Sequence, residues 1–114
     1  MARIHISRRA ALDLDDIDRY SIKKWGASVA DRYIQSIETA LQTLADNPDL
    51  LSLNVNMAQS FYLYRVREHY LVCSYKNDDI VVLTIKSGSL DIPTRLLELE
   101  PTLLREAEFL HRQF

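Results

Sequence analysis

The sequence has 114 residues, of which 47% are hydrophobic and 26% are charged, with only two glycines and three prolines. This composition excludes disordered and collagen-like chains, and the length predicts a single domain over residues 1–114 with one ordinary core. The net charge of −2 and the pI of about 5.9 predict no direct binding of nucleic acid. With one cysteine, no apolar leader and no apolar run of roughly 20 residues, we expect a reduced, cytoplasmic protein without a membrane span.

The N-terminal part predicts a short strand followed by two helices. The segment RIHIS alternates apolar and polar residues, as in a half-buried strand, and Ser7 is placed to cap a following helix. Apolar residues then recur at helical spacing as far as Gly26, which predicts the end of that helix. Ser28 is expected to cap a second amphipathic helix that ends before Pro48. Together these segments predict an antiparallel helical hairpin.

The middle of the chain is typical of strands. Residues 50–59 show no clear period and predict an irregular connection over the edge of a sheet. The segments SFYLYRVREHYLVCSY and IVVLTIKS are rich in aromatic and β-branched residues, and the turn signal KNDD divides them. With a break expected near 67–69, they predict two or three antiparallel strands.

The C-terminal tail, about 91–114, predicts a further helix. It is expected to begin near Asp91 or Pro93, and Pro101 predicts a kink or a restart. Its apolar residues recur every three or four positions, so the tail packs on the helices as core or presents an interface to a partner. The predicted fold class is α+β: an N-terminal strand, an antiparallel helical hairpin packed on a small antiparallel sheet, and a C-terminal helix.

The pattern of reactive residues predicts no catalytic site. The three histidines lie on three different predicted elements, and the chain has neither a metal-ligand spacing nor a glycine-rich phosphate loop, so we expect no metal and no cofactor. Acidic residues gather on the first helix, where a solvated face accounts for them: Asp13, Asp15, Asp16 and Asp18. Cys73 is expected to be a buried structural thiol. Trp25 fits either a core position or an interface anchor.

Four segments resemble the ParE branch of the RelE/ParE superfamily of bacterial toxins. They are ISRRAALDLDDIDRY, KWGASVADRYIQSIETALQTLADNP, YRVREHYLVCSYKNDDIVVLTI and SGSLDIPTRL, which follow one another in the family's order over nearly the whole chain. The most diagnostic residues are the pattern of Ala10, Asp13, Leu14, Ile17 and Tyr20, the Trp25–Gly26 turn, and the helix end at Leu44, Ala45 and Pro48. The resemblance departs at the last strand: many relatives have a histidine where this chain reads IKSGSLD, so the role of that histidine is not carried over.

The resemblance implies a toxin of a type II toxin–antitoxin module that inhibits growth by acting on DNA gyrase. It also implies a ParD-like antitoxin, encoded beside the toxin, that keeps it silent. Such antitoxins resemble disordered segments that fold on their partner, which requires an apolar groove with a charged rim. The groove between hairpin and sheet offers candidate antitoxin-binding residues: Tyr20, Trp25, Tyr33, Arg65 and Arg67. The last strand and the tail offer candidate target-binding residues: Lys86, Ser87, Leu103, Leu110 and Phe114.

Two other functions stay open at this point. A RelE-like, ribosome-dependent mRNA endoribonuclease would need basic and aromatic side chains of the sheet at the 2′-hydroxyl or phosphate: Arg65, Arg67, Tyr75 or Lys86. Residues 60–90 hold four basic and three acidic groups, a net charge of only +1, which disfavours a nuclease working amid dense phosphate. The other alternative is a non-toxic binding module on the same fold, since fold alone does not fix function.

Overall fold

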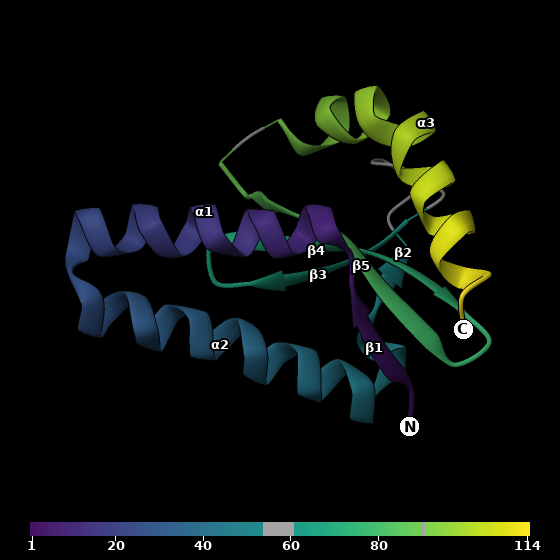
Figure 1. The fold of residues 1–114 in the computed structure, drawn as a ribbon, viewed down its shortest axis with the longest axis horizontal. Coiled ribbons are helices and arrows are strands. Elements are labelled where there is room, and N and C mark those ends of the chain that lie inside the picture. Colours follow the sequence, from purple (N-terminus) through teal and green to yellow (C-terminus); the bar gives the residue numbers. More distant parts are fainter. Residues whose placement is uncertain (54–60, 90) are drawn as a thin grey trace.

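The structure, a computed structural model, describes residues 1–53, 61–89 and 91–114. Figure 1 shows a sheet with a long helical hairpin on one side and a C-terminal helix on the other. The elements in chain order are β1 (Arg3–Ile6), α1 (Arg8–Trp25), α2 (Ala27–Asp46), a short 3-10 turn (Pro48–Leu50), β2 (Ser52–Leu53), β3 (Tyr62–Val66), β4 (His69–Lys76), β5 (Asp79–Ser87) and α3 (Ile92–His111). The predicted α+β class and element order are confirmed.

The helical hairpin has the predicted start but a different junction. Ser7 caps α1, because its side-chain oxygen accepts a hydrogen bond from the Ala10 backbone N–H at 3.0 Å. The prediction that Ser28 caps the second helix is wrong: α2 already begins at Ala27, and Gly26 precedes it without a side-chain cap. Gly26 has a φ of 91°, which glycine adopts without strain, so the two helices join through this single residue.

Five strands form one sheet in the order β1-β5-β4-β3-β2. Both expected turns between strands are confirmed, one at 67–68 between β3 and β4 and one at 77–78 between β4 and β5. In the second turn Asn77 and Asp78 have positive φ values of 53° and 65°, as in a two-residue hairpin loop. The sheet is mixed rather than wholly antiparallel, because β1 pairs parallel to β5. Residues 52–53, predicted to be irregular, pair with β3 as β2. Residues 54–59 of that predicted connection lie outside the described residues.

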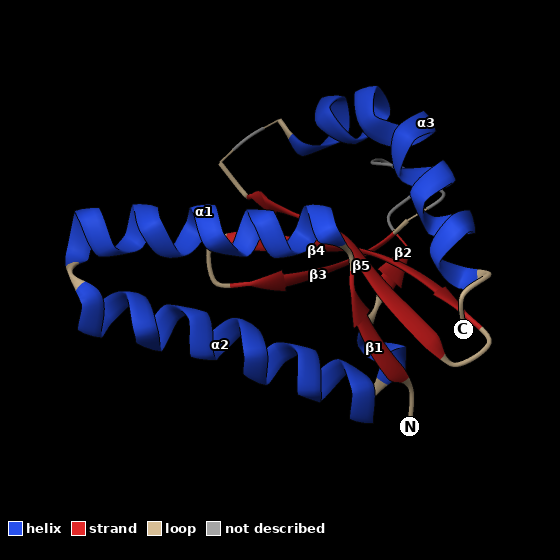
Figure 2. Ribbon diagram, in the orientation of Figure 1, coloured by secondary structure: helices blue, strands red, loops and turns tan. Residues whose placement is uncertain are grey.

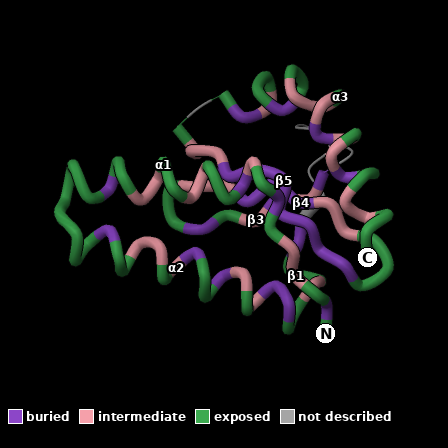
Figure 3. Tube along the Cα trace, viewed as in Figure 1, coloured by how far each residue is buried: buried purple, intermediate pink, exposed green. Residues whose placement is uncertain are grey.

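The sheet lies between the helical hairpin and α3 (Figure 2). It separates two hydrophobic cores, so the prediction of one ordinary core is wrong. Alternate residues of β5 face opposite sides: Ile80 and Val82 belong to the core under the hairpin, whereas Val81 and Leu83 belong to the core under α3. Buried residues accordingly concentrate along the strands, and exposed residues follow the outer faces of the helices (Figure 3). The chain thus builds helix layers on both faces of one sheet.

Helix α3 resolves the two interpretations of the tail in favour of packing, but the prediction that it packs on the helices is wrong, because it packs on the face of the sheet opposite the hairpin. Leu103 is fully buried in the second core, and Ala107 is buried beside it. Asp91 caps the helix by accepting a hydrogen bond from the Thr94 backbone N–H at 3.4 Å. Pro101 lies inside the helix, which continues without a restart, and the ribbon changes direction along its length (Figure 1).

One edge of β5 is completed by side chains of α1 instead of by a strand. Strand β1 ends at Ile6 opposite Val82, and beyond this point the Ser7 hydroxyl donates to the Leu83 carbonyl at 2.9 Å. The Asp13 carboxylate then accepts hydrogen bonds from the Ile85 backbone N–H at 3.0 Å and from the Thr84 hydroxyl. Asp13 was expected on the solvated face, and that prediction is wrong because its partners lie on β5, far along the chain.

Candidate partner-binding site

The β3–β4 turn places an arginine in an unusual backbone conformation. Arg67 has a φ of 52°, in the left-handed region that a non-glycine residue rarely adopts. Its guanidinium donates to the Ser36 hydroxyl at 2.9 Å and lies 5.9 Å from the centre of the Tyr33 ring. These contacts join the turn to α2, and such strain is typical of functional sites when the surroundings hold it in place.

Tyr33 and His69 form a polar pair beneath this arginine. The Tyr33 hydroxyl lies 2.6 Å from His69 Nδ1, and the Glu68 backbone N–H donates to the same hydroxyl at 3.3 Å. Burial lowers the pKa of His69 and raises the pKa of Tyr33, so both groups are uncharged near neutral pH. The hydroxyl and the imidazole therefore share a hydrogen bond between two neutral groups, and the pair forms a fixed, uncharged platform under the positive charge of Arg67.

The Arg65 side chain, on β3, is fixed by contacts with the β3–β4 turn and with Tyr70. Its guanidinium donates to the Arg67 carbonyl at 2.9 Å and to the Tyr70 hydroxyl at 3.2 Å, and it lies 5.2 Å from the Tyr70 ring centre. Lys86 and Ser87 stand opposite Tyr70 and His69 on β5, so these predicted target-binding residues lie at the same end of the sheet. We call this group the sheet-end cluster: Tyr33, Arg65, Arg67, Glu68, His69, Tyr70, Lys86 and Ser87.

Gly88 closes this end by a close backbone approach. Its N–H donates to the Glu68 carbonyl at 2.7 Å. A Cβ atom at Gly88 would lie 3.3 Å from that carbonyl oxygen and 3.4 Å from the Tyr70 ring, so a larger residue would push the turn outward.

A second group of exposed side chains lies at the far end of the hairpin. Tyr20 and Trp25 keep 58% and 50% of their surface exposed, and their rings meet edge to face at 6.0 Å. The Lys24 ammonium lies 4.9 Å from the Trp25 ring centre and 5.5 Å from that of Tyr20. We call Tyr20, Lys24 and Trp25 the hairpin-tip cluster. Of the two interpretations of Trp25, the structure supports a surface anchor rather than a core residue.

The structure separates the predicted site residues into three places. Tyr33, Arg65, Arg67, Lys86 and Ser87 gather at the sheet end, while Tyr20 and Trp25 lie at the hairpin tip. The tail residues lie elsewhere: Leu103 is buried, Leu110 is half-buried, and Phe114 stacks on His5 at 3.5 Å. Leu103 cannot touch a partner while α3 is docked. His69 was not predicted as a site residue, although its position just after the β3–β4 turn was a usable signal.

The arrangement does not assemble the nuclease residues considered from the sequence. Tyr75 stands opposite Ile80, at the other end of β4 from Tyr70 and Lys86, and its ring packs against Tyr62 at 6.3 Å. At the rise of about 3.3 Å per strand residue, Tyr75 lies roughly 16 Å from Tyr70. The four side chains Arg65, Arg67, Tyr75 and Lys86 therefore do not face one substrate position.

Other reactive groups give no sign of a metal or thiol centre. Within residues 1–53, 61–89 and 91–114, no group of three or more His, Cys, Asp or Glu side chains is placed to hold a metal ion. Cys73 is buried, as predicted, and burial raises the pKa of its thiol to about 12. The helices in this part of the chain are all too short or too polar to cross a membrane.

Known proteins resemble this chain in sequence and in fold. Residues 4–92 match the sequence model of the family described as ParE toxin of type II toxin-antitoxin system, parDE. Toxin ParE of Escherichia coli is 27% identical over 94 residues, covering 82% of this chain and 91% of that protein. Toxin ParE1 of Caulobacter vibrioides is 31% identical over 61 residues, covering 54% of this chain and 64% of that protein, so this alignment spans less than two thirds of the relative.

Solved structures show the same fold at low sequence identity. A chain of the chromosomal ParDE TA system from P. aeruginosa superposes with a TM-score of 0.67 at 19% identity, over 76% of this chain and 96% of that one. The YoeB dimer from Staphylococcus aureus gives a TM-score of 0.52 at 19% identity, over 75% and 94%. Because the family match extends from β1 to the first residue of α3, this chain belongs to the ParE toxin family of type II toxin–antitoxin systems.

Proposed function

We propose that this protein inhibits DNA gyrase by binding it, and that a ParD-like antitoxin keeps the toxin inactive in the cytoplasm. The match of residues 4–92 to the ParE toxin family carries this proposal. The geometry of the site agrees with action by binding: its polar groups are held by one another, and Tyr75, one of the side chains considered for a nuclease, lies at the opposite end of β4 from Arg65 and Lys86.

The antitoxin binds across the sheet-end and hairpin-tip clusters in this proposal. Exposed aromatic rings beside cations suit a partner segment with apolar and acidic side chains, because rings supply contact area and cations supply charge complementarity. Arg65 and Arg67 are exposed and have one acidic contact among the described residues, Glu68 at 4.0 Å from Arg65. Such a segment would fold on the toxin surface.

Neutralisation follows in this proposal from the part of the two predicted binding sets that meets at the sheet end. Lys86 and Ser87, which we assign to the target, stand directly opposite Tyr70 and His69 in the cluster that we assign to the antitoxin. An antitoxin seated on Arg65 and Arg67 would cover Lys86. Gyrase and antitoxin therefore compete for the sheet end, and each excludes the other.

A gyrase supercoiling assay with the purified protein tests the proposal, and a ribosome-dependent mRNA cleavage assay runs beside it on the same preparation. We expect inhibited supercoiling and intact mRNA, with supercoiling restored when the antitoxin from the adjacent reading frame is added. Lys86→Ala should weaken inhibition, whereas Lys23→Ala, an exposed lysine on α1, should leave it unchanged.

The other outcomes overturn the proposal in different directions. Cleaved mRNA with active gyrase would identify a RelE-like endoribonuclease and make Arg65 and Lys86 candidate catalytic residues. Antitoxin binding without either activity would identify a non-toxic binding module. Gyrase inhibition that persists at saturating antitoxin would contradict the competition at the sheet end.

A further inference from the structure

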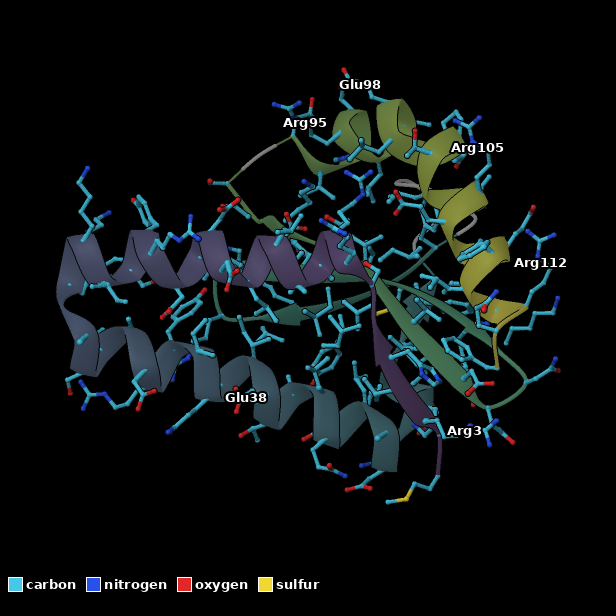
Figure 4. The ribbon with its side chains drawn as sticks, in the orientation of Figure 1. Arg3, Glu38, Arg95, Glu98, Arg105 and Arg112 are labelled. Carbon is cyan, nitrogen blue, oxygen red and sulfur yellow. The ribbon has the colours of Figure 1, made fainter. Side chains whose placement is uncertain are left out.

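A cleft of about 600 Å³ opens between the β4–β5 turn and the C-terminal end of α3. Its walls include Lys76 from β4 and His111 and Arg112 from the end of α3. Figure 4 shows two residues that line the cleft, Arg3 on β1 and Arg112 at the C-terminal end of α3. The cleft is separate from the sheet-end cluster, because Lys76 and His69 occupy opposite ends of β4.

A fixed polar network forms one wall of this cleft. The buried Asp79 carboxylate accepts hydrogen bonds from the Arg3 guanidinium at 2.8 and 3.1 Å, and His5 Nε2 lies 2.9 Å from the same carboxylate. These partners hold the pKa of Asp79 at about 2, so the carboxylate is ionised and its charge is balanced by Arg3. Asp79 is therefore poorly placed to repel an incoming anion.

Two cations in the lining remain without an acidic partner. Among the described residues, neither Lys76 nor Arg112 forms an ion pair, and Glu108 is the other acidic side chain of the lining. His111 adds a titratable group, and its Nε2 lies 2.9 Å from the Ser74 hydroxyl. Burial lowers the pKa of His111, and the charge of Lys76 lowers it further, whereas Asp79 acts in the opposite direction.

An aromatic ring stands beside these cations. Phe114 stacks on His5 with the ring centres 3.5 Å apart and the planes 10° from parallel, and it meets His111 edge to face at 6.5 Å. Phe114 still keeps 49% of its surface exposed, although one face of its ring is covered. This exposed part of the ring is surface on which a second planar group could stack.

We propose that this cleft binds a mononucleotide, with its phosphate beside Lys76, Arg112 and Ser74 and its base on the exposed part of the Phe114 ring. Ammonium, guanidinium and hydroxyl groups are the side chains that recognise phosphate oxygens, and an aromatic face takes any base by stacking. The cleft falls within the range of about 300–1,000 Å³ that small-molecule sites occupy. The site lies outside the sheet-end and hairpin-tip clusters, and it gives Phe114, predicted from the sequence as a target-binding residue, a different role.

Binding should strengthen as the pH falls from 7.5 to 6. His111 gains a proton more readily once a phosphate offsets the positive groups around it, and the protonated ring then donates to the phosphate. The groups that face His111 are His5, Ser74, Lys76 and Asp79 from the sheet, and Glu108 and Arg112 from its own helix. The phosphate itself also loses charge over this range, which works against tighter binding, so the pH effect must be compared with that of His111→Gln.

Isothermal titration calorimetry on the full chain tests the proposal with three probes: AMP, adenosine and inorganic phosphate. We expect AMP to bind with a Kd of about 1 mM or tighter, and both adenosine and inorganic phosphate to bind at least about tenfold more weakly. No AMP binding at about 10 mM overturns the proposal. Adenosine that binds as tightly as AMP overturns the role of the cations, and inorganic phosphate that does so overturns the role of Phe114.

Three variants locate the site. Lys76→Ala should weaken AMP binding at least about tenfold, which is the factor expected for one charge-assisted hydrogen bond, whereas Lys23→Ala should have no effect. Both lysines are exposed, so neither change is expected to unfold the protein. His111→Gln should remove any strengthening at pH 6. Equal losses in the two lysine variants, or an unchanged pH profile in His111→Gln, contradict the assignment.

Discussion

Replacing Asp13 by alanine removes both hydrogen bonds that complete the edge of β5. The Thr84 side chain is fully buried, so its hydroxyl loses the acceptor without gaining access to water. The Ile85 backbone N–H loses the same acceptor. Hydrogen bonds to a charged group contribute about 1.5–3 kcal/mol each, and a buried donor left without a partner costs the full desolvation of that group.

Asp13 is itself partly exposed, so the lower end of this range applies to each bond. The two bonds together then contribute about 3 kcal/mol to the free energy of unfolding. Alanine forms helices better than aspartate by roughly half a kcal/mol, which offsets part of the loss. We therefore expect Asp13→Ala to lower the free energy of unfolding by about 2 to 3 kcal/mol.

Urea unfolding followed by circular dichroism measures this change, and Asp16→Ala is the matched control. Asp16 lies on the same helix, is exposed, and should change the free energy of unfolding by no more than about 0.5 kcal/mol. A double-mutant cycle with Thr84→Val should give a coupling energy of about 1 kcal/mol or more. If Asp13→Ala and Asp16→Ala unfold at the same urea concentration, α1 does not stabilise the edge of β5 in the way described.

Four further outcomes follow from the contacts. Leu103→Ala should cost about 2–5 kcal/mol in urea unfolding because it opens a cavity, whereas Leu97→Ala, 61% exposed, should cost under about 0.5 kcal/mol. Asp79 has a pKa of about 2 against an ordinary 3.8. Its contribution to the free energy of unfolding is therefore complete above about pH 4 and disappears as the pH falls toward 2. Asp79→Asn should remove this loss of stability from an acid titration followed by fluorescence. Arg67→Gly should be more stable than Arg67→Ala by about 1 kcal/mol in thermal unfolding, because glycine relieves the positive φ; equal stabilities would argue against backbone strain. Trp25→Ala should weaken antitoxin binding by about 2 kcal/mol or more in calorimetry while costing the fold less; comparable losses would return Trp25 to the core.

The sequence predicted the elements whose signals are local. Helical spacing, the cap at Ser7 and the turn at 76–79 each depend on residues within one or two turns of chain, and all three were correct. Asp13 was misplaced because its function depends on Thr84, 71 positions away, which no local pattern encodes. The parallel pairing of β1 with β5 was missed for the same reason.

In the candidate site, too, the residues with a local signal could be predicted and those that depend on distant contacts could not. Arg65 and Arg67 could be singled out as charges on a predicted sheet, and the structure places them together. The pairing of Tyr33 with His69 could not be foreseen, since it requires the packing of α2 against the β3–β4 turn. The sequence spacing of Leu103 fits a core residue and an interface residue equally well. Only its packing in the core under α3 shows that it is a core residue.

The position of β5 inside the sheet has a consequence for how the molecule opens. This strand pairs with β1 and β4, and its opposite faces belong to the two cores. Detaching either helix layer would expose one face of β5 to water, while the core on its other face still depends on the same strand. Amide hydrogens of residues 80–85 should consequently exchange only through complete unfolding, at the slowest rate in the chain, and loss of α3 should accelerate exchange beneath the hairpin as well.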